Sequence, residues 1–336
     1  MVFMKKMATL TSHNRQEWID WMKVLGIYLI VLGHFYSIGE KQLYIFHVPL
    51  FFVISGILSK KEKDVCMFWN KIWYNLAVPM LIMVVINYIY ACILQISDGT
   101  FELKTIYWFA RNVLFGMVSG YGALWFVLTL ILLKIMFQYC PSKELFYSLV
   151  LIMLALAYIY NIIVLSNYPF FLSAPSAVVD VCTAYPFFAF GVFVHDFICK
   201  VSEWNNKIKL VLVFICSLFF VWISDHNNNY VAMYRCDYGG NLLFFLVGGV
   251  AGTMMIFALS KLFRHTFKPI TIISRGTIII LGFHIFFIDL VRVFLPKSYF
   301  DIFLAVVIVL LFIPLITMVE RYFPLMVGKY RISKNT

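Results

Sequence analysis

The chain alternates long apolar runs with short polar or basic segments, and this pattern is typical of a protein that crosses a membrane repeatedly. Ten runs approach the length of about 20 residues that a helix needs to span a hydrocarbon core. We place the predicted spans at 22–38, 42–58, 72–96, 122–139, 145–165, 181–199, 208–223, 241–262, 277–295 and 301–319. A shorter apolar run at 106–118 carries Arg111 and predicts an interfacial or re-entrant helix.

Composition agrees with this pattern. The 336 residues are 63% hydrophobic and 13% charged, whereas soluble domains are about half apolar and about a quarter charged. The predicted fold class is therefore all-α, a polytopic integral membrane helix bundle. We expect a single domain over residues 1–336, with a cytoplasmic N-terminal segment at 1–20 and a cytoplasmic tail at 320–336. We expect no cleavable signal peptide, because no short apolar core precedes the first long helix.

The basic residues predict how the bundle is oriented. With a cytoplasmic N-terminus and ten spans, 21 of the 27 Lys and Arg residues fall on the inner side and six on the outer side. This distribution follows the positive-inside rule and predicts that both termini are cytoplasmic. It also explains the net charge of +11 without a nucleic-acid partner. The seven cysteines form no CxxC pair, so we expect neither a disulfide framework nor a metal site.

Four ionisable residues interrupt the apolar pattern of the first two predicted spans: Asp20, Lys23, His34 and His47. Such groups are costly at membrane depth and usually mark function. Lys23 and His34 are eleven residues apart, which is about 16 Å along a helix and about half of a hydrocarbon core. A short polar turn, GEKQ at 39–42, separates His34 from His47, so both histidines should lie in the outer half of the membrane.

Each of these residues also has a structural explanation. Lys23 can be an anchor that snorkels to the inner interface, and His34 can supply a hydrogen bond between helices. His47 can be an interfacial histidine, and Ser55 and Gly56 can be small residues that permit close helix packing. These explanations weaken for the two histidines together, because they flank one tight turn.

Two sequence motifs carry a family resemblance. IDWMKVLGIYLIVLGH at 19–34 has a basic residue, ten intervening residues and a histidine, and FHVPLFFVISG follows at 46–56. The pair resembles the membrane-bound acyltransferase 3 family, especially its branch similar to fucose 4-O-acetylases. That family more often has Arg where this chain has Lys23, and Lys lacks the planar two-pronged donor geometry of Arg.

Three later segments extend the resemblance in order along the chain. They are NKIWYNLAVP at 70–79, GALWFVLTLIL at 122–132 and ISRGTIIILGFH at 273–284. They single out Lys71, Trp125, Arg275 and His284. Without the resemblance, Trp125 is explained as an aromatic-belt or core residue, and Arg275 is explained as a cytoplasmic positive charge. His284 reads equally well as a buried hydrogen-bonded histidine.

The resemblance implies acyl transfer from a coenzyme A thioester, with acetyl-CoA as donor, to a hydroxyl group that is usually on a sugar. The predicted catalytic residues are His34, His47 and His284, with His34 as the base. His47 can orient His34, bind the acceptor or carry a covalent acyl group. The predicted donor-binding residues are Lys23, Lys71, Arg15, Arg275 and Trp125, and the predicted substrate-binding residues are Asp20, which should also hold Lys23, and Ser55.

The expected partners are acyl-CoA, a glycan or lipid-linked sugar, and membrane lipid, at a bacterial cytoplasmic (inner) membrane. We expect a passage from Lys23 to His47 in which the donor and the acceptor meet. Two other classes remain open: a transporter or exporter of a glycan or glycolipid, and a membrane scaffold without chemistry. A succinyl donor is also open. We find no GxSxG, HExxH or phosphate-loop motif.

Overall fold

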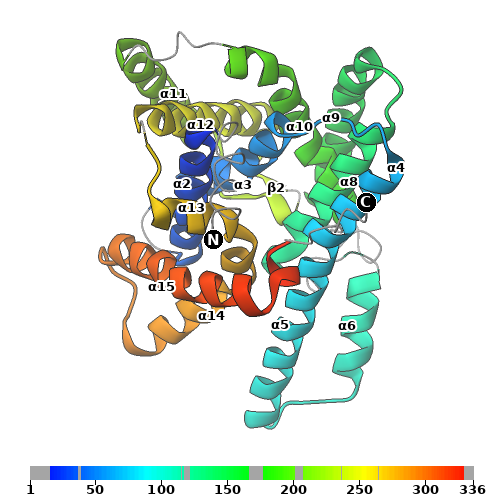
Figure 1. Cartoon of the computed structure of the whole chain (residues 1–336), viewed down its shortest axis with the longest axis vertical. Helices are drawn as coiled ribbons and strands as arrows, with labels where there is room; N and C mark the ends of the chain where they lie inside the picture. The colour runs from blue at the N-terminus through cyan, green and yellow to red at the C-terminus, as the bar shows by residue number, and fades with distance from the viewer. Residues whose placement is uncertain are drawn as a thin grey trace, which may run out of the picture.

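The computed structural model describes residues 16–36, 39–114, 116, 122–165, 177–200, 207–235, 237–263 and 265–328. Over these residues the chain is helical except for one short two-stranded ribbon (Figure 1). In this ribbon Val231 pairs with Tyr238 and Ala232 with Asp237, in antiparallel register. The predicted all-α class is therefore confirmed for the described part of the chain.

The helices of the first half are α2 (Glu17–His34), α3 (Glu40–Ile57), α4 (Val65–Ile72), α5 (Val78–Ser97), α6 (Lys104–Leu114), α8 (Trp125–Tyr139) and α9 (Lys143–Leu165). Those of the second half are α10 (Ala177–Lys200), α11 (Lys207–Asn227), α12 (Leu242–Leu262), α13 (Lys268–Arg275), α14 (Thr277–Phe294) and α15 (Asp301–Tyr322). Shorter elements are the π-helix η1 (Trp73–Ala77), the 3-10 turns η2 (Gly122–Leu124), η4 (Met233–Arg235) and η5 (Pro324–Val327), and strands β1 (Val231–Ala232) and β2 (Asp237–Tyr238).

Each of the ten predicted spans coincides with a helix, and the run at 106–118 corresponds to α6. The polar residues Glu40–Gln42, which we predicted as part of the turn, instead form the first turn of α3. Among the described residues, seven helices are long and apolar enough to cross a membrane. They lie at 65–97, 122–139, 143–162, 207–226, 242–262, 277–294 and 301–322.

Three helices that we predicted as spans are outside this set of seven. Helix α2 carries Glu17, Asp20 and Lys23 within its 18 residues, and the apolar stretch of α10, Val179–His195, is shorter. Helix α3 begins with Glu40 and Lys41 and contains His47. Because these three helices are outside the set of seven, the count of ten spans stays a prediction. The orientation also stays a prediction.

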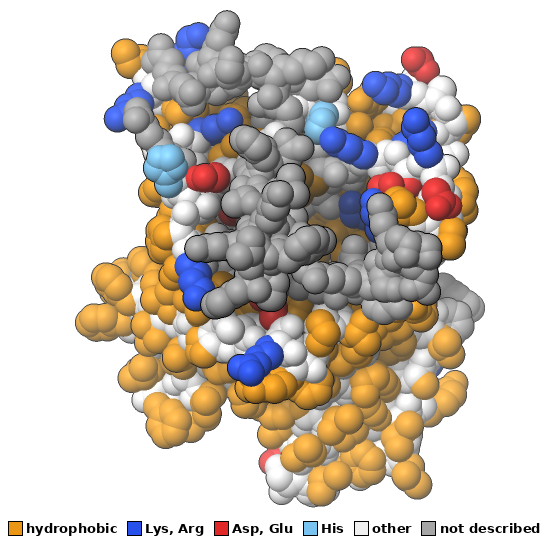
Figure 2. All heavy atoms as spheres, in the orientation of Figure 1, with side chains coloured by type: hydrophobic (Ala, Val, Ile, Leu, Met, Phe, Trp, Pro, Cys, Tyr) orange, Lys and Arg blue, Asp and Glu red, His pale blue; other side chains and the backbone are white. Residues whose placement is uncertain are grey.

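Helices α2 and α3 lie at the centre of the bundle. In Figure 1, α11 and α12 lie on one side of them, α8, α9 and α10 on the other, and α13, α14 and α15 below. Helix α3 contacts α2, α8, α10, α11 and α12. Helices α5 and α6 extend away from this body. In the orientation of Figure 1, Figure 2 shows apolar side chains over the lower part of the molecule and Lys and Arg side chains mostly above them.

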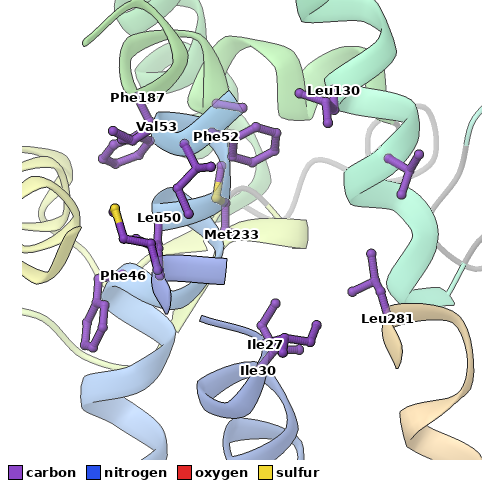
Figure 3. Close-up of a cluster of buried hydrophobic side chains, with 14 of the residues drawn as sticks. Ile27, Ile30, Phe46, Leu50, Phe52, Val53, Leu130, Phe187, Met233 and Leu281 are labelled. Atoms are coloured by element: carbon purple, nitrogen blue, oxygen red, sulfur yellow. The ribbon is translucent and has the colours of Figure 1, made fainter. Parts of the chain in front are cut away.

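Helices α3 and α10 meet backbone to backbone. A Cβ added to Gly56 would overlap the Phe188 carbonyl oxygen and would lie 2.9 Å from the Gly191 Cα atom. Gly191 is crowded in the same way by the Val53 carbonyl oxygen. Near this contact Phe187 of α10 packs close to Val53 of α3 (Figure 3). Small residues let membrane helices approach this closely, so the packing explanation for Gly56 is correct.

A buried ion pair ties the far end of α2 to α14 and α15. The Arg292 guanidinium donates to both carboxylate oxygens of Asp301, at 2.9 and 2.7 Å, and Asp301 is fully buried. Arg292 also donates to the Phe35 carbonyl oxygen at 2.8 Å and lies over the Phe35 ring, 4.7 Å from its centroid. The bidentate geometry is the strong form of this interaction, and it fixes the backbone next to His34.

Replacing Gly56 with Ala should destabilise the bundle, because the new methyl group meets backbone atoms that cannot rotate away. Overpacking of this kind costs about 1–3 kcal/mol or more. The measurement is the midpoint of thermal unfolding in detergent. Gly33→Ala is the matched control, since its Cβ would meet only the Tyr44 ring, at 3.4 Å. Equal midpoints for the two variants would contradict the assigned contact.

Asp301→Ala should also lower the unfolding midpoint, by more than Asp289→Ala does. Loss of one partner from a buried ion pair costs about 3–5 kcal/mol, because the remaining charge is left uncompensated. Asp289 lies on the exposed face of α14 and serves as the control. If both variants unfolded at the wild-type temperature, the Arg292–Asp301 pair would not hold α14 and α15 to α2.

Candidate active site

Three cavities follow one another along α2. The first has a volume of about 620 Å³ and lies where the start of α2 faces α13 and the start of α14. Its polar lining residues are Gln16, Asp20, Lys23, Lys60, Asn75, His195, Ser274, Arg275 and Thr277. We call this space the basic mouth, because its cations outnumber its single carboxylate.

The end of the described chain completes the wall of the basic mouth. Val327 of η5 lines the cavity, and η5 packs on the π-helix η1. Gly328 follows η5 with φ +68°, and a Cβ there would lie 2.7 Å from the Asn75 carbonyl oxygen. This position therefore favours glycine, and the close contact seats η5 against the mouth.

The second cavity, of about 210 Å³, continues from the basic mouth into the bundle. The two cavities share the lining residues Lys23, Leu58, Leu76, Thr277 and Ile278. Apart from Lys23, Ser55 and Thr277 the second cavity is lined by apolar side chains. Figure 3 shows four of them from three helices, Ile27, Ile30, Leu130 and Leu281.

The third cavity, of about 220 Å³, is lined by His34 and His47, and we call it the histidine cavity. It shares Ile30, Phe51, Phe126 and Leu281 with the second cavity, so the three spaces adjoin in series. Its polar and aromatic lining residues are His34, Tyr36, His47, Phe51, Trp125, Phe126 and Tyr234. The line of cavities therefore joins Lys23 to His34 and His47, as the sequence predicted.

His34 lies among aromatic and imidazole rings. Its ring centroid is 4.9 Å from that of His284, although α2 and α14 are about 250 residues apart in the chain. The His34 Nδ1 atom lies 3.4 Å from the Tyr36 hydroxyl and 3.5 Å from the Tyr44 hydroxyl. Both contacts are long, so His34 is held by ring packing more than by strong hydrogen bonds.

The other two histidines have a defined protonation at one nitrogen. His47 Nδ1 lies 2.6 Å from the Leu43 carbonyl oxygen, and His284 Nδ1 lies 2.9 and 3.0 Å from the carbonyl oxygens of Ile280 and Leu281. A carbonyl oxygen only accepts, so each Nδ1 donates a proton. In the neutral rings Nε2 is then a free proton acceptor. His284 Nε2 is buried without a hydrogen-bond partner in the described structure.

Aromatic hydroxyl groups lie next to His34 and His47. The Tyr44 ring lies 4.8 Å from the His47 ring and 5.1 Å from the Tyr230 ring. Tyr230 precedes β1 in the connection after α11, and burial raises the pKa of its hydroxyl above the usual value. Tyr36 has a positive φ of 50° and is 45% exposed, with the Lys297 ammonium 5.9 Å from its ring centroid. These groups offer hydrogen bonds and ring faces to a polar ligand.

The basic mouth has its own hydrogen-bonded frame. The buried Asp20 carboxylate accepts from the Ser274 hydroxyl at 2.5 Å, which ties α2 to α13. Arg275 forms an ion pair with Glu320 of α15 at 3.3 Å. His195 Nδ1 donates to the Ile57 carbonyl oxygen at 2.5 Å. The pairing of Asp20 with Lys23 stays a prediction.

The structure brings most of the predicted site residues to these cavities. The predicted donor-binding residues Lys23 and Arg275 line the basic mouth, Ser55 lines the second cavity, and Trp125 lines the histidine cavity instead of the mouth. Lys71 lies in a neighbouring cavity, where it pairs with Glu62 at 2.6 Å. Arg15 lies outside the described residues.

Sequence reasoning missed several residues of the site. Lys134 of α8 was counted only as an inner charge, although its position inside an apolar run is itself a signal of function. Tyr44 and Ser274 carry no signal of their own, because only the fold places them against His47 and Asp20. Within the described residues, no three His, Cys, Asp or Glu side chains gather as they would around a metal ion.

Comparisons with known proteins agree with the geometry. The sequence model of a family described as an acyltransferase domain, acyltransferase 3, matches residues 16–319. This match extends from the start of α2 almost to the end of α15 and includes both the basic mouth and the three histidines. The search of curated proteins finds no match, and the search of solved structures finds none either. Because the match covers most of the chain, the protein belongs to the acyltransferase 3 family and is a multi-pass membrane acyltransferase.

Proposed function

We propose that the protein transfers an acetyl group from acetyl-CoA to a sugar hydroxyl of a cell-surface or lipid-linked polysaccharide. The observation that carries this proposal is the line of adjoining cavities from the basic mouth to the histidine cavity. Coenzyme A is strongly anionic at one end and carries its thioester at the other. The basic mouth supplies cations for the anionic end of coenzyme A, and the histidine cavity supplies proton acceptors near the thioester.

The dimensions of the passage fit an extended donor. Lys23 and His34 lie on one continuous helix, α2, eleven residues apart, so the rise between them is about 16 Å. The phosphates would stay at Lys23 and Arg275 while the flexible arm passes through the apolar second cavity. The thioester would then reach the space between His34 and His47.

The transfer step assigns one role to each group. The sugar hydroxyl oxygen attacks the thioester carbonyl carbon, and the new C–O bond forms as the proton moves to a neutral histidine nitrogen. The C–S bond then breaks, and the thiolate takes the proton and leaves as coenzyme A. A sugar hydroxyl is a poor nucleophile at neutral pH, so the positioned base is what makes this attack fast.

We assign the base to His34, because it lines the histidine cavity and its ring packs against the His284 ring. The His284 ring lies against it with an unpartnered Nε2 atom. His284 can therefore accept a hydrogen bond from His34 and orient it. His47 lines the same cavity and presents its Nε2 acceptor either to His34 or to the acceptor sugar.

The wider setting belongs to the same proposal. Ten spans with both termini in the cytoplasm would place the basic mouth beside the cytoplasmic supply of acetyl-CoA and the histidines in the outer half. A bacterial cytoplasmic membrane and the fucose 4-O-acetylase-like branch fit this arrangement. The resemblance of FHVPLFFVISG to that branch supports this part of the proposal. The same segment contains His47 and the α3–α10 contact glycine.

His34→Ala should abolish most transfer from radiolabelled acetyl-CoA to the glycan or lipid fraction in membranes with matched protein levels. Loss of a general base lowers the rate by about 10²–10⁴-fold. His226→Ala is the control, because His226 is exposed at the end of α11 and bonds only within its own helix. Equal labelling by wild type and His34→Ala would remove His34 as the base.

Lys23→Ala should raise the KM for acetyl-CoA by about tenfold or more, because a charge-assisted hydrogen bond to phosphate contributes about 1.5–3 kcal/mol. The KM for the acceptor should change little. Lys63→Ala removes an exposed charge that lines none of the three cavities and serves as the control. An unchanged KM for acetyl-CoA would show that the mouth does not bind the donor through Lys23.

A further inference from the structure

A fourth cavity opens beside the basic mouth. Its volume is about 350 Å³, and it lies between the connection after α3, helix α4 and helix α8. It shares Leu58, Lys60, Asn75 and Leu76 with the basic mouth, so the two spaces adjoin. We call it the side cavity; its charged and amide lining residues are Lys60, Glu62, Lys71, Asn75, Lys134 and Gln138.

The connection between α3 and α4 is fixed onto α8 along this cavity. The Gln138 amide makes two hydrogen bonds with the Glu62 backbone, at 2.8 and 3.0 Å. The Lys61 ammonium donates to the Cys140 carbonyl oxygen at 2.5 Å. Lys60 is therefore held at the border of the two cavities by its neighbours on both sides. The cavity is a built feature of the fold and not a gap beside a loose loop.

The cations of the side cavity are not equivalent. Lys71 is neutralised by Glu62, whose carboxylate lies 2.6 Å from the Lys71 ammonium. Lys134 instead donates to the neutral Ser59 hydroxyl at 3.1 Å. Across the described ranges, no carboxylate lies within ion-pair distance of Lys134 or Lys60.

This arrangement is costly unless an anion occupies the cavity. Lys134 lies in a helix that is long and apolar enough to cross a membrane, and it is less than half exposed. A partly desolvated ammonium beside a second cation gains no compensation from one hydroxyl group. An anionic group between Lys60 and Lys134 would supply that compensation. Three acceptor oxygens and a double charge make phosphate the best match.

We propose that the side cavity is the phosphate site of the acyl donor, where Lys134 and Lys60 bind a phosphate of its nucleotide end. This inference rests on the proposed coenzyme A donor. The basic mouth then receives the remaining anionic groups, and the shared residues Leu58 and Leu76 lie where the nucleotide passes between the two cavities. Lys71 frames the cavity through Glu62 and contributes less to binding than Lys134.

The test is displacement of radiolabelled coenzyme A from the purified full-length protein by three probes: coenzyme A, dephospho-CoA and pantetheine. Dephospho-CoA lacks one of the phosphates of coenzyme A, and pantetheine lacks all of them. For the wild type, coenzyme A should displace at concentrations at least about tenfold lower than the weaker probe. In Lys134→Met this ratio should fall several-fold, and the cations of the basic mouth should keep it above one. Lys134→Arg keeps the charge and should restore most of it.

Lys143→Met is the matched control, because it removes the same charge from an exposed position at the start of α9. An unchanged ratio in Lys134→Met, with coenzyme A still bound, would overturn the phosphate site and leave the proposed function standing. Equal weakening of all three probes would also overturn it, since that result reports a structural role. If the wild type bound no coenzyme A, the proposed donor itself would be wrong.

A lipid headgroup carries the same phosphate chemistry, so the displacement is repeated with phosphatidylglycerol added to the detergent micelles. The proposal expects no displacement of coenzyme A by this lipid beyond that by phosphatidylcholine. Displacement by the anionic lipid in the wild type, and its loss in Lys134→Met, would assign the side cavity to a lipid and overturn the donor site.

Discussion

The contact between Gly56 of α3 and Gly191 of α10 is the constraint on which the rest of the structure depends. Helix α3 lies among five other helices, so its position along its own axis is set by how closely the tightest neighbour can approach. Because the two backbones touch, α3 cannot slide without a clash. The same helix carries Ser55 and His47 to two successive cavities, and its register therefore sets the length of the passage.

Buried polar groups inside the bundle differ in how completely their hydrogen-bonding capacity is satisfied. Asp301 is saturated by Arg292, and Asp20 accepts from Ser274. By contrast, the Nε2 atom of His284 has no partner in the described structure, and Lys134 has only a hydroxyl. Unsatisfied groups are expensive in an apolar environment, so a ligand that contacts the His284 Nε2 atom or the Lys134 ammonium would remove part of this cost.

The sequence predicted the positions of the helices along the chain better than it predicted which residues of different helices pack together. Each apolar run became a helix, because a run of this length leaves the backbone no other way to satisfy its hydrogen bonds in lipid. The spacing of Lys23 and His34 in the sequence predicted their separation along α2, because the rise per residue is constant within one continuous helix. Neither spacing nor composition places the His284 ring beside His34, and only the family resemblance grouped these two histidines. Trp125, which we predicted to bind the donor, lines the histidine cavity, and this position across the bundle depends on helix packing that a single sequence does not encode locally.

The apolar lining of the second cavity affects whether protons can leak along the passage. A continuous column of water between the basic mouth and the histidines would conduct protons and discharge the membrane potential. Its lining by Ile27, Ile30, Leu130 and Leu281 disfavours water in so narrow a space, as in channels that close by dewetting. The flexible arm of the proposed coenzyme A donor carries no charge and would pass through the same space. With the proposed function, the protein would join two aqueous compartments chemically while keeping them electrically insulated.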